Sequence, residues 1–74
     1  MNYYDNYVNM YRAATEENRR KSFEHWMNCH EMNVKNAAPE MIIFSGEILK
    51  RIIGEQIATA TADIKKNGYT WEEK

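Results

Sequence analysis

Cysteine, proline and glycine are all scarce: the 74 residues include one cysteine, one proline and three glycines. The single cysteine, Cys29, excludes a disulfide within the chain, and a lone thiol is typical of a reducing compartment. No apolar run approaches the roughly 20 residues that a membrane-spanning helix needs. The first six residues lack the basic start and apolar stretch of a signal peptide. We therefore expect a cytoplasmic protein with no part in a membrane.

The shortage of chain-breaking residues also argues against a strand-and-turn fold. Apolar residues recur instead at steps of three and four, which is typical of amphipathic helices. The net charge of −1 gives the chain no general attraction for nucleic acid or anionic lipid. The sequence therefore predicts a single all-α domain over residues 1–74, and it contains no motif that calls for a cofactor.

A first helix is predicted over about residues 3–32, followed by a connection over about 33–38. Thr15 offers an alternative, because a threonine followed by two acids suits the start of a second helix. We favour one continuous helix, since neither glycine nor proline interrupts it and its charged middle can form pairs four residues apart. The helical spacing is carried by Tyr4, Tyr7, Val8, Tyr11, Ala14, Phe23, Trp26, Met27 and His30.

A second helix is predicted over about residues 39–67. Pro39 fits its first turn, and Gly68 fits the residue after its end. Gly46 and Gly54 each weaken such a helix by about 1 kcal/mol relative to alanine, which suggests a close approach of another element or a bend. Residues 68–74 form a short aromatic tail that contains Tyr69 and Trp71.

Two long helices joined by a short connection are expected to pack as an antiparallel hairpin. The apolar face of the second helix is too wide for one neighbour to cover, so we expect a homodimer that forms a helical bundle. The alternative is a three-helix monomer broken at Thr15. The predicted oligomer interface consists of Ile48, Leu49, Ile52, Ile53, Ile57, Ala60 and Ile64.

Four tyrosines crowd the start of the chain, and tyrosine is enriched at protein interfaces. Tyr3 lies off the stripe formed by the others, so it is expected to be the most exposed. We predict a non-enzymatic binding or regulatory protein that occupies a surface of a larger protein partner. Its size and residue usage favour a phage or mobile-element inhibitor. The predicted partner-binding residues are Tyr3, Tyr4, Tyr7, Tyr11, Arg12, Arg19, Arg20 and Lys21.

The alternative function is DNA or RNA binding by a helical bundle through Arg12, Arg19, Arg20 and Lys21. Basic residues beside aromatic ones can hold phosphates and stack on bases. Three glutamates among the same residues cancel much of that field, so a solvated face with weak ion pairs explains the pattern equally simply.

His25 and Cys29 are weak candidates for metal ligands, because residues four apart share one face of a helix. A full zinc site needs about four ligands, and the chain has no second Cys/His pair. The simpler interpretation is two partly exposed histidines and a small buried thiol. We predict no metal site. We also predict no catalytic site, because no glycine loop or oxyanion feature accompanies this pair.

Overall fold

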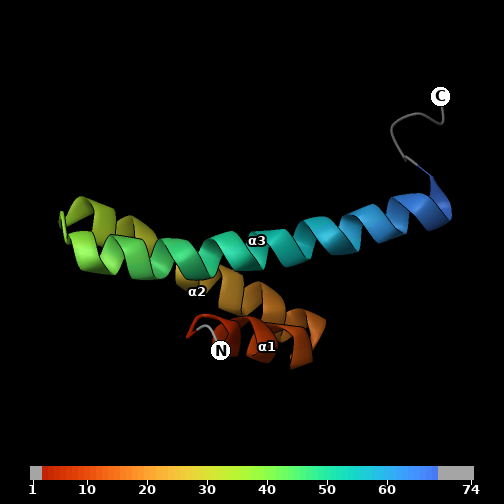
Figure 1. The fold of residues 1–74 in the computed structure, drawn as a ribbon, viewed down its shortest axis with the longest axis horizontal. Coiled ribbons are helices and arrows are strands. Elements are labelled where there is room, and N and C mark those ends of the chain that lie inside the picture. Colours follow the sequence, from red (N-terminus) through yellow and green to blue (C-terminus); the bar gives the residue numbers. More distant parts are fainter. Residues whose placement is uncertain (1–2, 69–74) are drawn as a thin grey trace.

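A computed structural model describes residues 3–68, which form three helices and no strand. These are α1 (Asp5–Ala13), α2 (Glu16–Lys35) and α3 (Pro39–Asn67), arranged as in Figure 1. The predicted all-α class and the bounds of the last helix are confirmed. The aromatic tail predicted beyond Gly68 lies outside the described residues. No helix of the described range has the length and apolar character needed to cross a membrane.

The prediction of one continuous first helix is wrong, because the chain breaks at Ala14 and Thr15. Ala14 has an extended backbone (φ −79°, ψ 157°), and Thr15 is the N-cap of α2. The Oγ1 of Thr15 accepts a hydrogen bond of 3.2 Å from the backbone N–H of Asn18, which satisfies one of the unpaired donors of the first turn. The break lets α1 fold back against both other helices, and the packing gained outweighs continuity.

A tight connection joins α2 to α3, and it is shorter than predicted. Ala37 has a positive φ of 52°, the left-handed conformation that usually ends a helix with glycine. Its N–H bonds to Val34 O and the N–H of Ala38 bonds to Asn33 O, both at 3.1 Å. This Schellman arrangement reverses the chain at once. Helices α2 and α3 therefore run antiparallel, and Pro39 occupies the first turn of α3.

The core is small and centres on α3. Ile48 and Ile52 are fully buried there, and Tyr11 of α1 packs against them. Five aromatic rings surround this cluster: Tyr4, Tyr7, Phe23, Trp26 and Phe44. The core uses only the first half of α3, and we call α1, α2 and residues 39–52 together the body.

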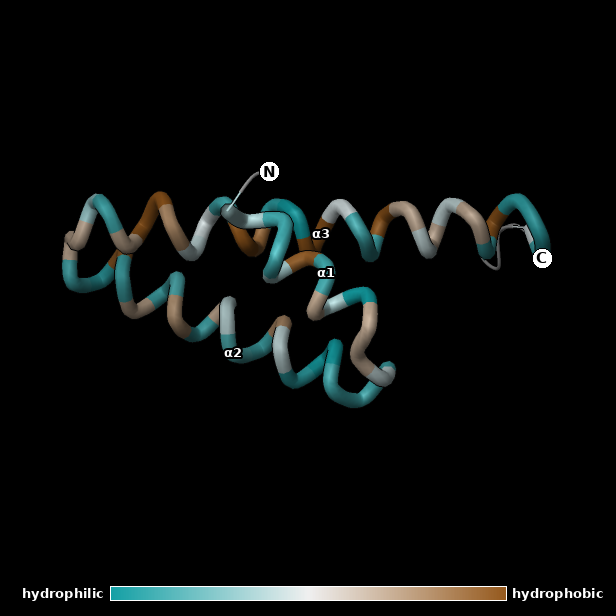
Figure 2. Tube along the Cα trace, turned by 60° about the horizontal axis from the view of Figure 1, so that its bottom comes forward, coloured by the Kyte–Doolittle hydropathy of each residue, from teal (hydrophilic) through white to brown (hydrophobic). Residues whose placement is uncertain are grey.

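The second half of α3 extends past this body. Figures 1 and 2 both show its last turns running beyond α1 and α2. We call residues 53–67 the α3 arm. No residue of the arm is buried, and Ile53 and Ile57 are 42% and 60% exposed. The arm is therefore held mainly by its own helical hydrogen bonds and by side-chain contacts between its first turn and α1.

Candidate functional site

The N-terminal tyrosines lie largely inside the fold. Tyr11 is buried, and Tyr7 meets the rings of Trp26 and Phe44 edge-to-face, with centroids 5.6 and 5.8 Å apart. Tyr3 is 60% exposed, as expected from its place off the stripe. Its hydroxyl lies 3.2 Å from that of Tyr7, a hydrogen bond that raises the pKa of Tyr7. Packing thus accounts for the tyrosine stripe, and a partner-binding role for it stays a prediction.

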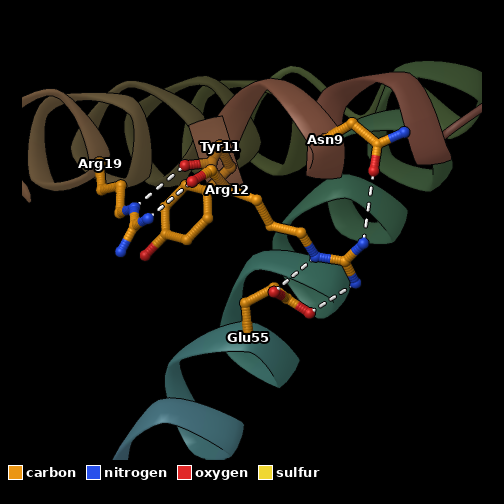
Figure 3. Close-up of polar contacts among 5 residues, drawn as sticks. All are labelled: Asn9, Tyr11, Arg12, Arg19 and Glu55. Carbon is orange, nitrogen blue, oxygen red and sulfur yellow. Dashed lines mark hydrogen bonds and ion pairs between the residues drawn. The ribbon is translucent and has the colours of Figure 1, made fainter. Parts of the chain in front are cut away.

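Arg12 joins α1 to the base of the α3 arm. Its Nε and Nη2 donate to the two carboxylate oxygens of Glu55 at 2.7 and 2.8 Å, and its Nη1 donates to Asn9 Oδ1 at 3.3 Å (Figure 3). This two-pronged geometry is the strongest form of such a pair. The bonds from Arg12 hold the pKa of Glu55 below its ordinary value. The pair therefore fixes where the arm leaves the body.

Arg19 holds the break between α1 and α2. Its Nε donates to Tyr11 O at 3.1 Å and its Nη2 to Arg12 O at 2.6 Å, as Figure 3 shows. These are carbonyls of the last turn of α1, and Tyr11 O also accepts a bond of 3.2 Å from the backbone N–H of the C-cap residue Ala14. The guanidinium also lies 5.8 Å from the centre of the Tyr11 ring. Arg19 thus acts as a cap for α1.

The predicted basic patch is therefore mostly occupied by contacts within the chain. Arg12 and Arg19 hold the fold together, and Lys21 lies 3.5 Å from Glu17 across one exposed turn. Arg20 is exposed. Nucleic-acid binding through these four residues stays a prediction, with less positive charge available than the sequence suggests.

A buried polar network, which the sequence analysis missed, joins α2 to the first half of α3. The Oγ of Ser45 is fully buried, donates to Met41 O at 2.9 Å, and accepts from Asn33 Nδ2 at 3.1 Å. His30 Nδ1 lies 2.8 Å from the same oxygen, within hydrogen-bond distance. Enclosed in this way, the serine cannot reach a substrate. The network is a structural joint between the helices.

Gly46 and Gly54 have different surroundings in the structure. A Cβ added to Gly46 would lie 3.2 Å from Cε1 of His30, whereas one added to Gly54 would meet nothing within 4 Å. Of the two predicted alternatives, the close approach is found at Gly46 and is not found at Gly54. Sequence alone could not tell the two glycines apart, because the difference depends on which part of α3 packs against α2.

His25 and Cys29 are not brought together with further ligands. The His25 ring packs edge-to-face against Trp26 at 5.3 Å, and the Sγ of Cys29 lies 3.8 Å from Asn33 Nδ2. Within residues 3–68 there is no group of three or more histidine, cysteine, aspartate or glutamate side chains that could hold a metal ion.

The predicted oligomer interface divides into two parts. Ile48, Leu49 and Ile52 are buried within one copy of the chain, so their assignment to a dimer contact is wrong. The reason is the break at Thr15, which supplies a third helix to cover them. The other four residues lie on the arm: Ile53, Ile57 and Ala60 are exposed and Ile64 is half-buried.

An open groove of about 920 Å³ runs between the arm and the junction of α1 with α2. Phe23 and Tyr11 give it an apolar side, and charged side chains flank them. Its lining consists of Tyr11, Glu16, Glu17, Arg19, Arg20, Phe23, Gln56, Thr59, Ala60 and Asp63.

Comparisons with protein-family models, with curated proteins and with solved structures find no match to this chain. The function is therefore argued from the surface of the chain itself.

Proposed function

We propose that the chain is a non-enzymatic binding protein that works by packing the α3 arm, with its adjoining groove, against an apolar helix of another protein. In this proposal the contact surface is the arm and not the N-terminal tyrosines, because most of the tyrosine side chains pack within the fold. Recognition of this kind uses apolar residues repeated along one helix face.

The arm carries such a repeat. Ile53, Ile57, Ala60 and Ile64 follow one another at steps of four, three and four residues, the spacing of a coiled-coil seam. We call these four residues the arm ridge. At about 100° per residue the arm ridge lies roughly 80–140° around the helix from the buried Ile52. It thus adjoins the buried stripe of Ile48, Leu49 and Ile52 and widens the apolar face on one side.

The exposure of Ile53 and Ile57 is the observation that carries the proposal. Burying an isoleucine side chain fully is worth about 1.5–3 kcal/mol, and only part of this is realised within one copy at these positions. The groove beside them adds the apolar surface of Phe23 with a charged border. An apolar centre inside a polar rim is the usual anatomy of a protein interface.

Site-specific photocrosslinking in cells that express the chain tests this function. A photoreactive amino acid replaces Ile57, and a matched variant carries it at Ile43. Both are exposed isoleucines of α3, at 60% and 62%, but Ile43 lies outside the arm ridge. We expect a discrete protein adduct at position 57, lost when Ile53→Glu is added, and none at position 43. The absence of any adduct at position 57 would refute the proposal.

A further inference from the structure

We infer that Asn67, the last residue of α3, is a site of spontaneous deamidation. Its side-chain amide is converted to a carboxylate through a cyclic imide that forms with the backbone nitrogen of Gly68. The reaction needs no enzyme and no co-reactant except water. It does not depend on what the arm binds, so it stands apart from the proposed function.

The residue that follows Asn67 sets it apart from the other asparagines of the chain. Of the eight asparagines, Asn67 alone precedes a glycine. To close the imide, the nitrogen of the following residue has to reach Cγ of the asparagine. A side chain on that residue hinders the approach, whereas glycine has no Cβ and adopts the required backbone angles freely. The sequence therefore places the most reactive pair of residues at the end of the arm.

The end of α3 leaves the attacking nitrogen weakly protected. Asn67 and Gly68 are both exposed, and Gly68 has a non-helical backbone, with a φ of 78° and a ψ of 173°. Its N–H donates to Ile64 O at 2.7 Å, the bond that closes the last turn. The free energy that opens a fraying helix end is close to zero, so this bond breaks often and frees the nitrogen.

Asn36 lies at the end of α2 and provides an internal comparison. It is exposed like Asn67, but alanine follows it, and the N–H of Ala37 bonds to Val34 O at 3.1 Å. The helices on either side of this connection pack against each other, so it opens only when the body opens. We therefore expect Asn36 to keep its amide while Asn67 loses it.

The reaction balances in two steps. The Gly68 nitrogen loses its proton and bonds to Cγ of Asn67, and the side-chain nitrogen leaves Cγ as ammonia. Water then opens the imide at either of its carbonyls, which gives aspartate or isoaspartate. No group is oxidised or reduced. One carboxylate is added, so the net charge of the chain changes from −1 to −2.

The product should loosen the end of the arm. Its carboxylate lies at the C-terminal end of α3, where the helix dipole is also negative. Lys65 and Lys66 in the same turn reduce the repulsion, so we expect the amides of residues 64–67 to exchange only about twofold faster. In the isoaspartate product, the backbone runs through the former side chain and cannot continue the helix.

Peptide mapping by mass spectrometry tests the site, after incubation of the purified chain at mildly alkaline pH and body temperature. The peptide that carries Asn67 should gain the mass difference between a carboxylic acid and an amide, with isoaspartate among the products. The rate should rise with pH, because the nitrogen attacks without its proton. The peptide that carries Asn36 should not change. Asn67→Gln keeps an amide and Gly68 but closes a ring one atom larger, so it should stay unconverted.

The same incubation in guanidinium chloride tests the part played by the helix end. Conversion of Asn67 in the folded chain should be within about tenfold of its rate in the unfolded chain, because the terminal bond opens easily. Conversion only in guanidinium chloride would show that the bond from Gly68 to Ile64 protects the site, and would overturn the inference. Equal conversion of Asn36 and Asn67 in the folded chain, or a product with aspartate alone, would also overturn it.

Discussion

The two halves of α3 share one unbroken helix but differ in what holds them. Residues 39–52 supply most of the core, and α1 and α2 pack on them from two sides. Residues 53–67 contain three isoleucines and three alanines, against four isoleucines and no alanine in residues 39–52, yet no residue of 53–67 is buried. Local sequence therefore gives both halves the same secondary structure, while only one half is part of a tertiary structure.

The comparison shows that an apolar face is not by itself a core. Ile52 and Ile53 are adjacent, yet one is fully buried and the other is 42% exposed, because a helix turns by about 100° at each residue. A face becomes core only where another element packs against it, and here α1 meets the arm only at its base, through the Arg12–Glu55 pair. The apolar side chains of the arm that are not buried within one copy can therefore stabilise a complex when a partner buries them.

The largest expected contrast is between Ile52→Ala and Ile57→Ala. Ile52→Ala creates a cavity in the core and should lower the free energy of unfolding by about 2–5 kcal/mol. Ile57→Ala should change it by no more than about 0.5 kcal/mol, because the side chain touches little within one copy. Urea unfolding at a concentration that keeps the chain as one copy measures both. Equal losses in the two variants would mean that the arm is packed within the monomer.

The glycine pair gives a smaller contrast along the same helix. Gly54→Ala should stabilise the chain by up to about 1 kcal/mol, since alanine favours the helix and its Cβ meets open space. Gly46→Ala should gain less or lose stability, because its Cβ would press on a His30 ring that is fixed by its bond to Ser45. Thermal unfolding of the two variants side by side measures the difference. A larger gain at position 46 would contradict the role given to His30.

Much of this fold could be predicted because it depends on local sequence. The 29 residues of α3 follow from apolar spacing, Pro39 at one end and Gly68 at the other. The break at Thr15 was also visible, since the residue and the two acids after it suit a helix start. Sequence alone does not favour the break over a continuous helix, because folding α1 back is stabilised by contacts between Tyr11 and Ile52, which are distant in sequence.

The site was harder to predict, because it too depends on contacts between residues that are distant in sequence. Tyrosines and arginines near the start of the chain have the chemistry of an interface, and sequence alone could not show that Glu55 and the carbonyls of α1 already engage the arginines. The His30–Ser45 bond joins residues that no motif connects. The four residues of the arm ridge were accessible from the sequence as part of the predicted interface, because their four-three-four spacing is local; what sequence could not show is that Ile48, Leu49 and Ile52 beside them are buried.

A change in the α2–α3 connection should affect the body alone. Ala37→Gly should stabilise the chain by about 0.5–1 kcal/mol, because glycine adopts a positive φ without the steric cost that alanine carries. Native-state hydrogen exchange is the measurement. Amides of residues 42–52 should exchange about two- to fivefold more slowly, while those of the arm, which open locally, should not change. Equal slowing in both halves would show that α3 opens as one unit.

The smallest expected effect concerns the Arg12–Glu55 pair at the boundary between body and arm. Its hydrogen bonds hold the pKa of Glu55 below the ordinary value of 4.5, so the folded chain keeps this carboxylate charged to lower pH than the unfolded chain does. The stabilisation is therefore complete above that value and is lost as the pH falls through the lower, folded pKa. Glu55→Gln should be less stable than the parent at pH 7, and the difference should shrink on acidification.

Arg51→Gln, which removes the pairing that lowers the pKa of Glu47 within the body, is the matched control. Only Glu55→Gln should also speed exchange of the first amides of the arm, because Arg12 fixes that end of it to α1. Equal exchange in the two variants would mean that the arm leaves the body without help from this pair.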